Sequence, residues 1–173
     1  METAFETQIV KTKAYNKITV IIFGILYLIS TFYIFLYDKE NQNIYLKFVA
    51  LAIYISGIYF LFGQSFIKPK KIGTLRITKA HIAVEKNDLN KHIALEQLEH
   101  IGLNYLDYGS WATHSIYGNK NYLEITETSG DTHKFEILIK NRRHKNDLKT
   151  ILRSPEFDEK FDIITMPLSR KVF

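Results

Sequence analysis

Two long apolar segments near the N-terminus constrain the fold of this chain more than any other feature. The first, residues 18–37, is twenty residues long and carries no charge. At 1.5 Å rise per residue, a helix of that length is about 30 Å long, the thickness of a bilayer core. The second, residues 44–66, has one charge, Lys47, near enough to its end to reach the headgroups. The two segments predict a transmembrane helical hairpin (residues 18–66) whose short external loop is residues 38–43.

Two other interpretations of these segments are less favoured. A helical hairpin buried in a soluble protein needs more surrounding protein than this chain supplies. A cleaved signal peptide has an apolar core of about 7–15 residues and a small-residue cleavage site. The first segment is longer, lacks such a site, and is followed directly by the second.

Basic residues predict the orientation of the hairpin. Lysines precede the first segment and follow the second, whereas the loop has only Lys39, between Asp38 and Glu40. Because Lys and Arg accumulate on the cytoplasmic side, we expect a multi-pass protein of the inner (cytoplasmic) membrane with both termini in the cytoplasm. Residues 1–17 are then a cytoplasmic N-terminal segment.

After the hairpin the spacing of apolar residues changes from the helical repeat of about 3.6 residues to an alternation with a repeat of two residues. Six segments alternate apolar and polar residues, which is typical of strands: 73–78, 81–85, 91–95, 100–106, 121–126 and 133–139. Asn141 then caps a helix that places His144, Leu148, Ile151 and Leu152 on one side. This order predicts an α+β domain over residues 67–153, with an antiparallel, strongly bent sheet or partly open barrel of about six or seven strands closed by the C-terminal helix.

The tail, residues 154–173, has the pattern of a short helix. Ser154 is suited to the N-cap and Pro155 to the first helical position. Phe157, Phe161 and Ile164 then form an apolar stripe. The stripe fits docking on the domain or on another copy of the chain, and the sequence leaves both open.

The strand segments carry a family resemblance. A transmembrane hairpin followed by "IGTLRIT", "HIAVEK", "KHIALEQLEHIG", "NYLEITETSGDTHKFEILI" and a helix resembles the bacterial pleckstrin-homology-like (PH-like) domains of small membrane proteins. The resemblance includes the I-x-L-x-x-L-x-x-I pattern of Ile93, Leu95, Leu98 and Ile101. Eukaryotic relatives carry a lipid-binding basic motif in the turn between their first two strands. That turn, assigned here to Lys79 and Ala80, does not hold the motif.

Charge in the domain is segregated into two basic clusters that flank an acidic body. Residues 68–79 carry five basic and no acidic side chains. Residues 80–139 carry four basic and nine acidic side chains, and residues 140–153 carry six basic and one acidic. Each basic residue beside an anionic leaflet contributes about 1 kcal/mol of attraction. We therefore interpret Lys68, Lys70 and Lys71 as a headgroup collar. Arg142, Arg143 and Lys145 fit a solvated helix face or, less often, a patch for anionic lipid or an acidic partner.

The segment 105–122 is unusually aromatic. It holds the single tryptophan, Trp111, together with Tyr108, His114 and Tyr117. Exposed aromatic groups of this kind are frequent binding hot spots, so these four residues are candidates for a partner-binding site. Plugging one end of the sheet explains them equally well.

Catalytic and metal-binding motifs are missing from the sequence. There is no cysteine, no H-E-x-x-H, no G-x-S-x-G and no phosphate-cradling glycine loop. No cofactor, nucleic acid or small-molecule substrate is expected. The sequence predicts a non-enzymatic membrane-anchored interaction or scaffold module that binds a protein partner at or in the membrane, with lipid headgroups as secondary contacts and self-association left open. The alternatives are a regulator or immunity-type inhibitor of a membrane-active partner and an enzyme with a dispersed site.

Overall fold

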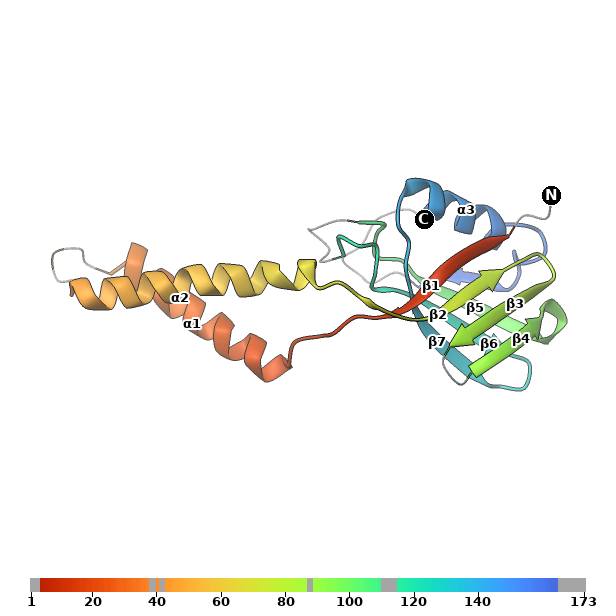
Figure 1. Ribbon diagram of the computed structural model, residues 1–173, viewed down its shortest axis with the longest axis horizontal. Coiled ribbons are helices and arrows are strands. Elements are labelled where there is room, and N and C mark those ends of the chain that lie inside the picture. Colours follow the sequence, from red (N-terminus) through yellow and green to blue (C-terminus); the bar gives the residue numbers. More distant parts are fainter. Residues whose placement is uncertain (1–3, 38–39, 41–42, 87–88, 110–114, 165–173) are drawn as a thin grey trace. The chain divides into compact units, whose positions relative to one another are not determined.

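The computed structural model describes residues 4–37, 40, 43–86, 89–109 and 115–164. The chain divides into two compact units, one of residues 13–67 and one that combines residues 1–12 with residues 68–173 (Figure 1). The second unit therefore combines the first twelve residues of the predicted N-terminal segment (residues 1–17) with the predicted domain (residues 67–153) from residue 68 onward and the tail.

The first unit consists of two helices, α1 (Lys17–Phe35) and α2 (Ile44–Gly63), followed by a short 3₁₀ turn (Gln64–Phe66). The helices pack closely at Gly57, where an added Cβ would lie 2.7 Å from the Tyr27 ring. Stacked rings extend this contact, Tyr27 on Tyr54 and Phe23 on Phe60. Two further small residues on the hairpin, Ser30 and Ala50, are buried.

Most of the apolar surface of the hairpin is exposed. Helix α1 has a mean hydropathy of 2.3 over its most apolar window, of which only 6% is buried, and it is long and apolar enough to cross a membrane. Among the described residues α1 alone meets this description, and the apolar stretch of α2, Ile44–Phe60, is shorter. The hydroxyls of Ser30 and Thr31 donate to the Tyr27 carbonyl, at 2.9 and 2.7 Å, so these polar groups are satisfied within the helix.

The second unit is an eight-stranded sheet and one helix. The strands are β1 (Phe5–Lys11), β2 (Lys70–Ile77), β3 (His81–Lys86), β4 (Leu89–Ala94), β5 (Leu98–Asn104), β6 (Asn121–Glu127), β7 (Thr132–Ile137) and β8 (Phe161–Ile163). Their order is β4-β3-β2-β1-β7-β6-β5-β8, antiparallel except where β8 runs parallel to β5. The α+β class and a mainly antiparallel sheet are thus as predicted, and the six predicted strands correspond to β2 through β7.

The sheet is strongly curled. Strands β4 and β5 are six strand-to-strand steps apart in the sheet, about 29 Å in a flat sheet at 4.8 Å per step. Yet the chain passes from Ala94 to Leu98 through a three-residue 3₁₀ turn, and four residues reach at most about 14 Å. Side chains confirm the curl, since Lys91 on β4 contacts Glu127 on β6, with Nζ 2.5 Å from Oε1. The inner face forms one continuous apolar core.

Two strands were missed by the sequence analysis, so the predicted count of six or seven was too low. Strand β1, from the segment placed outside the domain, pairs with β2 from Phe5↔Ile77 to Lys11↔Lys70 and with β7 at Ile9↔Ile137. Phe5 and Ile9 are fully buried in the core. The alternation of Phe5, Thr7 and Ile9 is a strand signal, but its partner β2 lies beyond the whole hairpin.

The tail also differs from the prediction. Helix α3 (Arg142–Leu152), capped by Asn141, has the predicted buried residues Leu148, Ile151 and Leu152. After it, residues 155–160 form consecutive turns in place of the predicted helix, and β8 follows. Phe157 is fully buried in the domain core, and Lys160 Nζ donates to the carbonyls of Leu95 and Leu98 at 2.9 and 2.5 Å. The described part of the tail therefore docks on its own domain.

Candidate functional site

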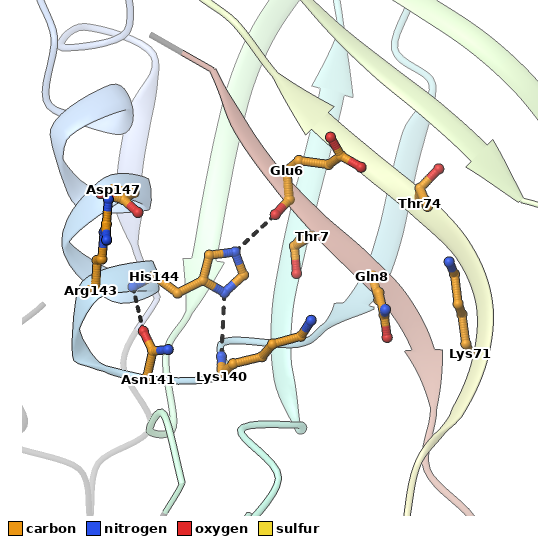
Figure 2. Close-up of a pocket in the computed structure, with 10 residues that line it drawn as sticks. All are labelled: Glu6, Thr7, Gln8, Lys71, Thr74, Lys140, Asn141, Arg143, His144 and Asp147. Atoms are coloured by element: carbon orange, nitrogen blue, oxygen red, sulfur yellow. Dashed lines mark hydrogen bonds between the residues drawn. The ribbon is translucent and has the colours of Figure 1, made fainter.

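A cleft of about 350 Å³ lies where β1, β2 and the first turn of α3 meet (Figure 2). Its lining is polar and comes from three stretches of the chain: Glu6, Thr7, Gln8, Lys71, Thr74, Lys140, Asn141, Arg143, His144 and Asp147. The cleft brings together Lys71 of the predicted collar and Arg143 of the predicted helix patch. These residues are far apart in the sequence, so only the fold places them at one site.

The cleft lies beside the seam between β1 and β7, the strand pair of the sheet with the fewest ladder positions. Strand β1 pairs with β2 along its whole length but with β7 at only one ladder position, Ile9↔Ile137. Beyond that position the seam is held by the Leu138 N–H, which donates to the Gln8 carbonyl at 3.1 Å, and by the buried Thr7 hydroxyl, which donates to the Leu138 carbonyl at 2.5 Å. One wall of the cleft therefore belongs to β1 and β2, and the other to the segment after β7.

His144 ties these two walls together. Its ring stacks on Phe5 with centroids 4.6 Å apart, and its Nε2 lies 2.9 Å from the Glu6 carbonyl oxygen, which only accepts hydrogen bonds (Figure 2). Its Nδ1 accepts the Lys140 N–H at 3.3 Å. These partners assign the donating N–H to Nε2 and the accepting lone pair to Nδ1. The predicted position of His144 on the apolar side of the helix is confirmed, and the structure adds its role as a link between β1 and α3.

A second polar cluster secures the end of β1. The Glu136 carboxylate on β7 accepts the Thr12 N–H at 2.8 Å, the Thr12 hydroxyl, and the Lys120 N–H at 2.9 Å. Asn119 Nδ2 donates to the Thr12 hydroxyl at 2.8 Å. Burial lowers the pKa of the Lys120 ammonium below its usual value, and the nearby Glu136 carboxylate opposes that shift. The point at which the chain leaves β1 is thereby fixed to β7.

The predicted basic groups divide between different surroundings. Lys68 and Lys70 are exposed, and Lys70 begins β2, so the collar continues directly into a strand. Arg142 and Arg143 are exposed at the start of α3, but only Arg143 lines the cleft. Lys145 is half-buried, with Nζ 5.2 Å from the centroid of the Tyr105 ring. The three residues of the predicted helix patch therefore have different surroundings, and Arg143 is the one that lines the cleft.

The aromatic candidates are only partly described. Trp111 and His114 lie outside the described residues. Tyr108 is half-buried against the core, whereas Tyr117 is exposed. The described ends of this segment are held firmly, because the buried Asn121 side chain accepts the Leu106 N–H at 2.8 Å and donates to the Gly118 carbonyl at 2.9 Å.

No protein-family model matches this chain, and no curated protein matches its sequence.

Proposed function

We propose that this protein is a membrane-anchored, non-enzymatic PH-like interaction module that presents its cleft and sheet at the cytoplasmic face of the membrane. One observation carries the proposal: the helical hairpin is inserted between two strands that pair with each other. The chain leaves the sheet at Lys11 and returns at Lys70, which are direct register partners. A segment that starts and ends at the same place crosses a bilayer an even number of times.

This pairing supports two spans and argues against the other interpretations. If α1 crosses the membrane, the chain needs a second crossing to reach β2. Helix α2 has 20 residues, about 30 Å of helix, and supplies it. Cleavage of α1 as a signal sequence would remove β1, with buried Phe5 and Ile9, from the middle of the sheet.

The charge distribution supports the cytoplasmic assignment. Lys11 and Lys13 precede α1, and Lys68, Lys70 and Lys71 follow α2, whereas the connection between the helices carries one lysine with two acids. The excess of lysine at the sheet end favours the cytoplasm for the domain.

The strand order supports the PH-like assignment. Seven strands in the order β4-β3-β2-β1-β7-β6-β5 curl around one core, and α3 follows β7. With β1 included, the turn at Lys79 and Ala80 joins the second and third strands. The segment between the first two strands is the hairpin. The membrane hairpin thus occupies the position at which eukaryotic relatives carry their lipid-binding motif.

Single-cysteine labelling tests the topology. The chain has no cysteine, so Glu40→Cys between the helices and Thr128→Cys between β6 and β7 each give one reactive site on a clean background. In intact cells, a membrane-impermeant maleimide should label Glu40→Cys only, and Thr128→Cys should react after the membrane is opened. Labelling of both sites from the same side would refute the hairpin.

A further inference from the structure

We propose that the cleft between β1, β2 and α3 is a binding site for a phosphate-bearing anion, held by Lys71, Lys140 and Arg143 with Gln8 as an uncharged contact. As a lipid headgroup site, the inference rests on the proposed membrane anchoring. As a site for a free phosphate group, the inference rests on the cationic side chains of the cleft alone. Its volume of about 350 Å³ falls within the ordinary range of small-molecule sites, about 300–1,000 Å³.

Three cationic and two acidic side chains line the cleft, an excess of one positive charge. Within the described part of the chain, no ion pair forms at Lys71, Lys140 or Arg143. Of the two acids, Glu6 is the direct cross-strand partner of Arg76, which does not line the cleft. Asp147 lies one helical turn after Arg143 and offsets the charge of that one cation. Lys71 and Lys140 therefore make the Gln8 side of the cleft positive.

A bulge in β2 directs Lys71 into the cleft. The pairing register of β1 and β2 shifts by one residue between the pairs Ile9↔Gly73 and Val10↔Lys71. This shift leaves Ile72 without a partner on β1. Regular alternation would put Lys71 and Thr74 on opposite faces, yet both line the cleft, while Ile72 packs against the core. The irregularity that breaks the strand pattern therefore aims a lysine at the site.

The opposite wall supplies the second and third cations. Figure 2 shows the Lys140 side chain extending from the segment before α3 toward the strand side, where Gln8 and Lys71 lie. Arg143 stands one residue before His144, whose ring is locked by Phe5 and the Glu6 carbonyl. A bound anion thus contacts both walls and bridges the weak β1–β7 seam.

Chain connectivity favours a phosphate group as the anion. Lys71 is five residues beyond Phe66, the end of the hairpin unit's last helical turn, so the chain between them reaches at most about 18 Å. Lipid phosphates are the most concentrated anions within that distance of a bilayer. Lysine and arginine both bind phosphate through charge-assisted hydrogen bonds.

Hydrogen–deuterium exchange on the full chain in nanodiscs tests the site. One arm uses phosphatidylcholine discs titrated with inorganic phosphate, and the other uses discs containing phosphatidylglycerol without added phosphate. Binding should slow exchange several-fold in peptides that cover residues 5–11 and 137–145, because the Leu138 and Lys140 N–H groups lie on the bridged seam. The arm that responds identifies a free phosphate or a headgroup as the source.

Two double variants that each remove two positive charges distinguish binding in the cleft from non-specific electrostatic attraction of the anion to the protein. Lys71→Gln with Arg143→Gln removes two cations of the cleft, and Lys70→Gln with Arg142→Gln removes their exposed sequence neighbours, which do not line it. We expect the first pair to raise the phosphate or lipid concentration for half-maximal protection about tenfold or more, and the second less than about twofold.

Either of two results overturns the site: no protection in both arms, or an equal loss in both double variants. Unchanged exchange without phosphate verifies that each variant is folded. The phosphate arm does not depend on membrane topology, so failure of the cleft and failure of the cysteine-labelling experiment are distinguishable.

Discussion

At the scale of single residues, Glu127 shows how the curled sheet is held shut. It is buried, and its Oε1 lies 2.5 Å from Lys91 Nζ on β4 and 2.8 Å from His133 Nε2 on β7. Lys91 and His133 are themselves 3.1 Å apart. One carboxylate oxygen therefore joins an edge strand to two strands on the far side of the curl.

Glu127→Gln should weaken this closure. The amide is neutral, so it leaves the partly buried Lys91 ammonium without its counter-charge, and we expect the free energy of unfolding to fall by about 1–3 kcal/mol. Urea unfolding of the domain, followed by circular dichroism with the hairpin in detergent, measures the change. Glu124→Gln is the matched control, because its pair with Lys134 is exposed and contributes less than about 1 kcal/mol. Equal effects of the two substitutions would contradict the role of Glu127.

At the scale of elements, β1 joins the two halves of the sheet. It is the strand between β2 and β7, and it contributes Phe5, Ile9 and Val10 to the buried residues. Strand β8 is different. It has three residues, pairs with β5 at the edge of the sheet, and its side chains are partly exposed or exposed.

Deletion of residues 2–12 should therefore prevent the domain from folding. It opens two strand edges in the middle of the sheet and removes three core side chains, each worth about 1.5–3 kcal/mol of burial. Limited proteolysis should degrade β2 and β7 in this variant. Truncation after Lys160, which removes β8, should leave the other seven strands resistant. If both truncated chains resist proteolysis equally, β1 is not the joining strand.

At the scale of the whole molecule, the hairpin is an insertion into a domain whose own chain is continuous in space. Lys11 and Lys70 are partners on adjacent antiparallel strands, so their Cα atoms are only about 5 Å apart. The domain core consists of residues from both sides of the insertion, and none of its buried members comes from the described part of residues 13–67.

Replacing residues 13–69 with four glycine and serine residues should consequently yield a soluble, folded domain. Linkers of two to five residues join antiparallel strands as ordinary hairpin loops. Retaining Thr12 keeps its hydrogen bonds to Glu136. Size-exclusion chromatography and circular dichroism should show a monomer with the strand content of the parent domain. A variant recovered only as an aggregate would show that the domain depends on its hairpin.

Much of this architecture was predictable because the signals are local. A twenty-residue uncharged run, alternation such as Leu123 and Ile125, and an Asn cap before Leu148 and Ile151 are each carried by neighbouring residues. The tail was mispredicted for the same reason. Ser154 and Pro155 form a good helix start, but burial of Phe157 and the bonds of Lys160 favour turns that lead to β8.

The sequence by itself determined the apolar hairpin, six strands, the capped helix and the two basic clusters, since each depends on periodicity or composition within a short window. Only the tertiary structure decided that residues 5–11 belong inside the sheet, that the hairpin interrupts the domain, and that Lys71, Lys140 and Arg143 share one cleft. The physical reason is that β1 pairs with β2, and the β2 bulge orients Lys71, although the whole hairpin separates the two strands in the sequence. No local pattern specifies which strand edge a segment will meet.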